Sequence, residues 1–104
     1  MIRTPAILLS LVVVAGLSQG AAAADAGQGG VLAKRWCAAC HVVAADQTAV
    51  SGQAPPFSTI GKIADLDVGK LALFLLLPHP KMPDMNLTRA EAADIAAYIQ
   101  SQGK

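Results

Sequence analysis

The chain has 104 residues, 54% of them apolar, and its eight Lys and Arg residues nearly balance seven Asp and Glu residues. This length suits one small domain, and the near-zero net charge without a basic run excludes the pattern of a nucleic-acid-binding protein. With two Phe, one Trp and one Tyr, the chain offers few large flat groups to its own interior.

The amino-terminal segment has the features of a secretory signal. Residues 1–3 give a positive start, residues 6–17 are an unbroken run of apolar and small side chains, and residues 22–24 offer a small-residue cleavage site. The run is well short of the ~20 residues that cross a bilayer. We therefore predict a cleaved signal peptide over residues 1–24 and a periplasmic domain over residues 25–104, with no membrane span after cleavage.

Residues 25–36 are predicted to form the first helix, with Asp25 as its N-cap. Three apolar residues recur at about one turn and are predicted to face inward: Val31, Leu32 and Trp36. Gly29 and Gly30 each cost about 1 kcal/mol in a helix interior. Either the helix begins after them, or one of them lets another helix approach closely.

The sequence Cys-Ala-Ala-Cys-His at residues 37–41 is typical of covalent haem attachment. Cys37 and Cys40 would form the two thioether bonds, and His41 would bind the iron as proximal ligand. The motif therefore predicts haem c as the cofactor.

Three other interpretations of the two cysteines are weaker. A thioredoxin-like redox pair calls for a preceding strand, which the sequence lacks. A zinc site needs two more ligands at finger-like spacing, and the other histidine, His79, is too far along the chain. A structural disulfide leaves the adjacent His41 unexplained.

Residues 42–58 show no sustained periodicity and are predicted to form a loop, from which Phe57 turns inward. Pro55 and Pro56 fix the backbone there. A carbonyl of this segment is suited to accept the Nδ1 proton of His41, which would orient the ring. The prolines are equally consistent with a stiffened turn alone.

A second helix is predicted over residues 67–77, with Asp67 as N-cap. Its nearly continuous apolar run predicts burial on more than one side. Leu71 and Phe74 would contribute to one wall of the haem crevice, although a plain helix-helix contact would have the same pattern.

Three prolines make residues 78–83 rigid and extended, which suits a segment that holds one side chain still. Met82 is the candidate second ligand of the iron, because a thioether is a soft ligand that favours reduced iron. Met85 is the rival and His79 a weaker one. Filling space in the core is the commoner role of methionine.

The last helix is predicted over residues 88–102. Thr88 and Glu91 have the spacing of a capping box. A buried stripe follows, formed by Ala92, Ile95, Ala96 and Ile99 with Tyr98 beside it. Gly29 or Gly30 is where the first helix could cross this one.

Over nearly all of residues 25–104 the sequence resembles class I c-type cytochromes. The matching parts are Gly29 ahead of the Trp-Cys-Ala-Ala-Cys-His run at 36–41, Ala-Pro-Pro-Phe at 54–57, Pro-His-Pro-Lys-Met-Pro at 78–83 and Glu-Ala-Ala-Asp-Ile-Ala-Ala-Tyr-Ile at 91–99. The resemblance implies an all-α cytochrome c fold, with about three to four helices around one covalent haem.

The resemblance also implies roles for individual residues. The ligand methionine of the family precedes the aromatic residue of the last helix by a spacing that Met82 matches and Met85 does not. Gly29 and Tyr98 would lie where the first and last helices cross, and the Pro55 carbonyl would accept from His41.

The function implied is that of a one-electron carrier rather than an enzyme, with redox proteins such as a dehydrogenase or terminal oxidase as donor and acceptor. Four basic residues could guide an acidic partner to the haem edge, or form an ordinary solvated face: Lys34, Arg35, Lys62 and Lys81. Two alternatives remain: an electron-transfer subunit of a periplasmic dehydrogenase or oxidase complex, and a ligand sensor or peroxidase should methionine ligation be weak.

Overall fold

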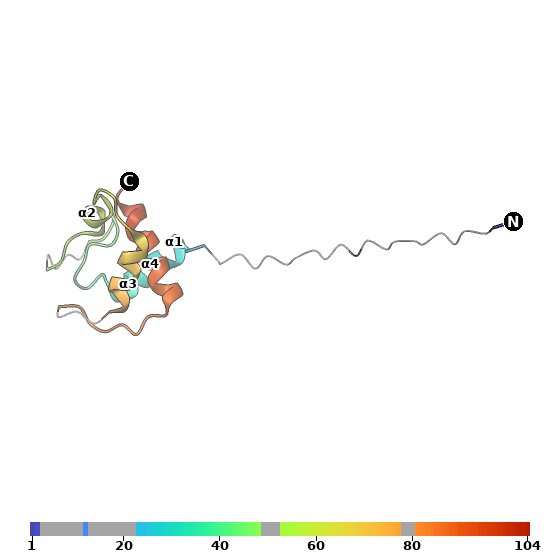
Figure 1. Cartoon of the computed structure of the whole chain (residues 1–104). Coiled ribbons are helices and arrows are strands. Elements are labelled where there is room, and N and C mark those ends of the chain that lie inside the picture. The colour runs from blue at the N-terminus through green and yellow to red at the C-terminus, as the bar shows by residue number, and fades with distance from the viewer. Residues whose placement is uncertain (3–11, 13–22, 49–52, 78–80) are drawn as a thin grey trace.

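The computed structural model describes residues 1–2, 12, 23–48, 53–77 and 81–104. Over these residues the chain forms helices and no strand (Figure 1): α1 (Ala26–Trp36), α2 (Phe57–Gly61), α3 (Val68–Leu76) and α4 (Arg89–Gln102). The predicted all-α fold is therefore confirmed. Most of the predicted signal sequence lies outside the described residues, as does His79.

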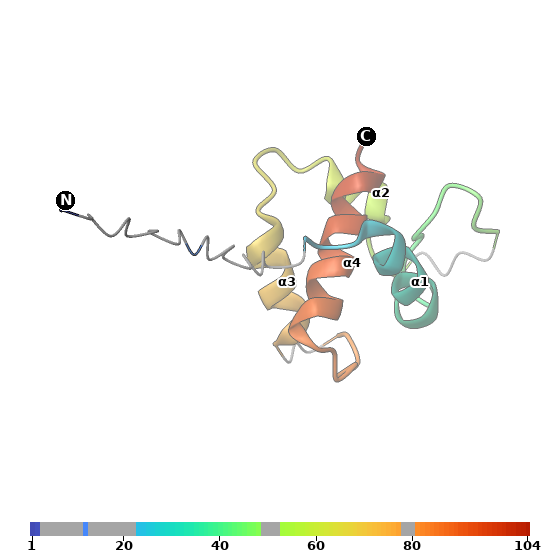
Figure 2. The ribbon, with the colours of Figure 1, turned by 90° about the vertical axis from the view of Figure 1, so that its right-hand side faces the viewer.

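Helix α4 holds the other helices together. In the described part of the chain, α1, α2 and α3 each contact α4 and do not contact one another. Figure 2 shows α4 in the middle, with α3 on one side and α1 and α2 on the other. The predicted stripe of α4 lies at the centre of this arrangement, and all four of its residues are buried: Ala92, Ile95, Ala96 and Ile99. Among the described residues no helix has the length and apolar character needed to cross a bilayer.

The contact between α1 and α4 is made at two glycines. A Cβ on Gly29 would collide with the Asp94 carbonyl, and a Cβ on Gly30 would lie 2.9 Å from the Tyr98 ring. The helix thus contains both glycines, and they permit the close approach. The predicted crossing of Gly29 with Tyr98 is confirmed.

Of the three residues predicted to face inward from α1, Leu32 is buried, Val31 is not, and Trp36 borders the cavity described below. Val31 is 62% exposed and Trp36 is 38% exposed, with the Arg35 guanidinium 5.0 Å from the Trp36 ring. The buried face instead consists of Gly29, Gly30, Leu32 and Ala33. The helix turns its smallest side chains toward α4 because those let the two backbones approach.

Helix α2 lies partly within the segment predicted as a loop. Phe57 begins this short helix and is buried in the core, as predicted. At its other end, a Cβ on Gly61 would collide with the Ile99 carbonyl and lie 2.6 Å from the Gly103 nitrogen. One turn of helix is too short to give a periodic pattern in the sequence. Contact with the end of α4 therefore explains why α2 forms partly where the sequence predicted a loop.

Helix α3 has the predicted boundaries, with the Asp67 carboxylate accepting from the Lys70 amide at 3.0 Å. The predicted burial on more than one side is wrong. Of its residues only Leu75 is buried, whereas Leu73 and Phe74 are about half exposed, at 55% and 50%. One face of α3 contacts α4, and Phe74 borders a cavity described below.

The start of α4 has the predicted capping box. The Glu91 amide donates to the Thr88 hydroxyl at 3.1 Å, and the Thr88 amide donates to Glu91 Oε1 at 3.0 Å. A further bond joins this helix to the start of α1, because the Asp25 amide donates to Asp94 Oδ1 at 2.8 Å. The start of α1 is therefore tied to the first half of α4.

We expect Gly29→Ala to destabilise the fold, because the added methyl group would collide with the Asp94 carbonyl. Overpacking costs up to about 3 kcal/mol, and the better helix propensity of alanine returns about 1 kcal/mol. The free energy of unfolding in a guanidinium titration should fall by about 2 kcal/mol. In the control Gly27→Ala, the methyl group would meet only Asp25 Oδ1, at 3.2 Å, and stability should not fall. Equal losses of unfolding free energy in the two variants would contradict a close approach of α1 and α4 at Gly29.

The capping box predicts a pH dependence. Hydrogen bonds from the Thr88 amide and with its side chain lower the pKa of Glu91. A carboxylate with a lowered pKa stabilises the folded state above its unfolded pKa, roughly 4.3, and that contribution disappears as the pH falls through the lower folded pKa. Glu91→Gln should therefore lower the unfolding free energy at pH 7, and the difference from the wild type should vanish at acid pH. A difference that stays constant between pH 7 and pH 3 would show that the carboxylate charge contributes nothing.

Candidate haem site

A tight turn carries the two cysteines and the histidine away from the end of α1. The Cys37 and Ala38 amides both donate to the Ala33 carbonyl, at 2.8 and 3.2 Å. The Cys40 and His41 amides then both donate to the Cys37 carbonyl, at 3.1 and 2.9 Å. The turn therefore keeps the two sulfurs and the imidazole at one end of the helix.

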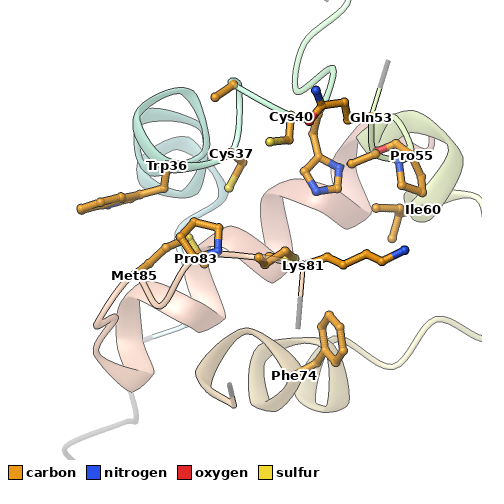
Figure 3. Close-up of a pocket in the computed structure, with 14 residues that line it drawn as sticks. Trp36, Cys37, Cys40, Gln53, Pro55, Ile60, Phe74, Lys81, Pro83 and Met85 are labelled. Carbon is orange, nitrogen blue, oxygen red and sulfur yellow. The ribbon is translucent and has the colours of Figure 1, made fainter. Parts of the chain in front are cut away.

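These three side chains line a cavity of about 900 Å³. In Figure 3, Cys37 and Cys40 lie on one side, Pro55 and Ile60 beside them, and Phe74 with the segment around Pro83 across from them. The lining residues are Trp36, Cys37, Ala39, Cys40, His41, Gln53, Ala54, Pro55, Ile60, Phe74, Lys81, Met82, Pro83 and Met85. The volume is at the upper end of ordinary ligand pockets, and the lining is mostly apolar.

The His41 ring is held at one nitrogen. Its Nδ1 lies 2.6 Å from the Pro55 carbonyl oxygen, and its ring centroid lies 5.2 Å from that of Phe57. A carbonyl oxygen can only accept, so Nδ1 donates, and in the neutral ring Nε2 keeps its lone pair. The arrangement therefore leaves Nε2 as a metal-binding atom, with the second partner that metal-bound histidines usually have.

The other predicted pocket residues are divided between the cavity and the core. Phe74, Met82 and Met85 line the cavity. Phe57 and Leu71 do not; they pack in and against the core cluster beside Val43 and Ile95. For Phe57 the reason is that its amide donates to the Val42 carbonyl at 2.9 Å, which holds the start of α2 against the chain after His41.

Two side chains fix this region through hydrogen bonds that the sequence did not predict. The Tyr98 hydroxyl donates to the Val43 carbonyl at 2.6 Å, and the Gln47 amide bonds the backbone around His41. Gln47 lies in a polar stretch with no periodic pattern, so nothing in the sequence indicated that its side chain bonds the backbone near His41. The position of Tyr98 beside the buried stripe indicated packing but not its hydroxyl contact.

The weaker interpretations of the cysteines find no support in the described residues. Burial raises the pKa of the Cys37 thiol to about 11, whereas a redox-active pair needs a lowered pKa. In the described part of the chain, no group of three or more His, Cys, Asp or Glu side chains could hold a metal ion. No disulfide joins Cys37 and Cys40 in the structure.

The cavity fits a haem by its donor set, its volume and its mostly apolar lining. Two thiols and an imidazole with a free Nε2 stand at one side, and two thioether side chains, Met82 and Met85, line the same space. Thiols that add to the porphyrin vinyl groups, an imidazole and a soft sulfur are the groups that hold haem c. Haem would also supply the large flat apolar group that the cavity lacks.

Comparison with curated proteins gives a match to cytochrome c-552 of Bradyrhizobium diazoefficiens, with 57% identity over 88 residues, which are 85% of each chain. The chain belongs to the class I c-type cytochromes. No protein-family model and no solved structure matches it.

As a member of this family, the cytochrome carries a covalent haem c and is an electron-transfer protein, not an enzyme. The bound haem supplies a one-electron couple at its iron. The protein supplies the turn that presents Cys37 and Cys40, and a mostly apolar cavity beside them.

Replacement of each cysteine separately tests the attachment. In Cys37→Ala or Cys40→Ala one vinyl group stays unreacted and conjugated with the macrocycle, so the α band of the alkaline pyridine complex should move to longer wavelength. Acidified acetone should extract haem from neither single variant, since one thioether remains. The control Ala39→Ser, at an exposed position between them, should match the wild type. A single variant with the wild-type band would show that its cysteine forms no thioether.

Proposed function

We propose that this cytochrome is a periplasmic one-electron carrier whose haem iron is bound by His41 and Met82. The observation that carries the proposal is the hydrogen bond between His41 Nδ1 and the Pro55 carbonyl, which leaves Nε2 for the iron. A hydrogen bond at the other ring nitrogen fixes the ring and raises its basicity.

Met82 is the proposed second ligand. It lines the cavity and is also packed against the core cluster, so its side chain has a support as well as access to the cavity. It lies between Lys81 and Pro83, and Pro83 fixes the backbone direction after it. Met85 also lines the cavity and is the rival, with 6% of its surface exposed. A thioether stabilises ferrous iron, which raises the reduction potential.

The cavity wall supports electron transfer over chemistry on a bound substrate. No carboxylate lines the cavity in the described part of the chain, and its polar side chains include His41, Gln53 and Lys81. A peroxide-cleaving site needs a positioned acid-base group near the iron. His41 and Met82 would bind the iron from the two sides of the cavity, and the bound haem would then exchange one electron without binding a substrate.

The location rests on the sequence of the amino-terminal segment. We propose that residues 1–24 direct export and are removed, so that residues 25–104 form the cytochrome domain in the periplasm. Asp25, the first residue of that domain, caps α1 by accepting from the Gln28 amide at 3.1 Å. The proposed cleavage site therefore immediately precedes the N-cap of α1.

The partners are redox proteins, and we propose a dehydrogenase or terminal oxidase among the donors and acceptors. Basic residues lie exposed on the elements around the cavity: Lys34, Arg35, Lys62 and Lys81. Because acidic and basic residues nearly balance over the whole chain, long-range steering should be weak. Recognition would then depend on short-range contacts.

The ligand assignment is tested on the protein matured in a host that attaches haem. The ferric wild type should be low-spin with the methionine-to-iron charge-transfer band, and the reduced form should not bind carbon monoxide rapidly. Met82→Ala should abolish that band and lower the midpoint potential by more than about 59 mV, which is a tenfold change for a one-electron couple.

Met85→Ala is the matched control, since it removes the same side chain from the same cavity. It should keep the charge-transfer band and most of the potential. Equal effects of the two variants would contradict the choice of Met82. A high-spin ferric wild type that takes up carbon monoxide rapidly on reduction would contradict the carrier function itself.

A further inference from the structure

The side-chain amide of Gln47 makes three hydrogen bonds to the backbone of the haem-attachment turn. Its Nε2 donates to the Ala38 carbonyl at 3.2 Å and to the His41 carbonyl at 3.0 Å. Its Oε1 accepts from the Val43 amide at 2.8 Å. One side chain therefore joins the beginning of the turn, its end and the residue that leads out of it.

A local turn brings Gln47 back to this position. The Gln47 amide donates to the Ala44 carbonyl at 3.2 Å, so the chain reverses direction directly after Val43. Val43 is 1% exposed and belongs to the core cluster. The buried Val43 side chain fixes the first residue of the reversal in the core. At the other end, the Gln47 side chain bonds the backbone of the turn that carries His41.

The backbone from His41 to Val43 is held by bonds to four parts of the chain, the first of which is the bond from the His41 amide to the Cys37 carbonyl at 2.9 Å. The His41 carbonyl and the Val43 amide bond Gln47, the Val42 carbonyl accepts from the Phe57 amide at 2.9 Å, and the Val43 carbonyl accepts from the Tyr98 hydroxyl at 2.6 Å. Gln47 therefore provides two of these five contacts and is the residue that bonds the His41 carbonyl.

We propose that Gln47 is a positioning residue for the haem ligand His41. The imidazole is oriented at its ring by the Pro55 carbonyl and at its backbone by Gln47, and both contacts are needed to set the ring plane. The proposal rests on the proposed ligation of iron by His41. It goes beyond that ligation, because it assigns ring orientation to a side chain that does not line the cavity.

The chemistry of the site requires an amide. The two carbonyls need donors and the Val43 amide needs an acceptor, and among neutral side chains of this length glutamine offers both. Glutamate at this position keeps the acceptor and faces two carbonyl oxygens with no donor at neutral pH. Methionine has a similar length and has neither the amide donor nor the amide acceptor of glutamine. The two replacements therefore separate the donor contacts from the acceptor contact.

The test compares the holoprotein variants Gln47→Glu and Gln47→Met with Gln100→Glu and Gln100→Met, which make the same changes at an exposed position of α4. Nuclear magnetic resonance of the ferric protein gives the hyperfine shifts of the haem methyl groups, which depend on the plane of the axial imidazole. Amide exchange in the ferrous protein reports the Val43 contact.

We expect both Gln47 variants to change the order or spacing of the haem methyl shifts, because both lose the donors to the Ala38 and His41 carbonyls. Val43 amide exchange should accelerate on the order of tenfold in Gln47→Met and stay near the wild-type rate in Gln47→Glu, which keeps the acceptor. The midpoint potential should move further in Gln47→Glu than in Gln100→Glu.

Unchanged methyl shifts in Gln47→Glu would overturn the proposal, even if the variant were less stable, because a purely structural role would lower stability without turning the ring. Should Gln47→Met not fold, Gln47→Glu decides. A failure of the proposed ligation is distinguishable, since the wild type itself would then lack the low-spin spectrum.

Discussion

The close contact of α1 with α4 is the constraint on which the site depends. Helix α1 leads directly into the turn that carries Cys37 and His41, and in the described residues α4 is the helix that it contacts. The opposite wall of the cavity comes from α3 and the segment around Met82, and α3 also contacts α4. The two walls are thus placed relative to each other through one helix, and Gly29 sets how deeply α1 lies on it.

The two sides of the cavity are stabilised in different ways. Around His41 the backbone is fixed by hydrogen bonds from Gln47, Phe57 and Tyr98. Across from it, Phe74 is half exposed and the lining includes two methionines, whose thioethers are adaptable. A rigid proximal side and a softer distal side would let a large flat cofactor fill the cavity without strain on its histidine.

Much of the fold follows from local signals. Three helices, the Asp67 and Thr88 caps and the buried stripe of α4 were predicted, because caps and periodicity are properties of neighbouring residues. The inward face of α1 and the exposure of α3 were predicted wrongly, since they depend on which helix lies opposite. At the site, the motif at residues 37–41 was recognisable by residue type. The part played by Gln47 was not, because its partners are backbone groups, which every residue has.

With the proposed cleavage after Ala24, the bond from the Asp25 nitrogen to Asp94 would link export to folding. In the precursor this nitrogen is a neutral amide. Cleavage after Ala24 would give it a positive charge, and a hydrogen bond between charged groups is roughly twice as strong as a neutral one. Removal of the leader would then strengthen the contact between the start of α1 and α4. The processed protein would hold its cofactor between more firmly packed helices than the precursor does.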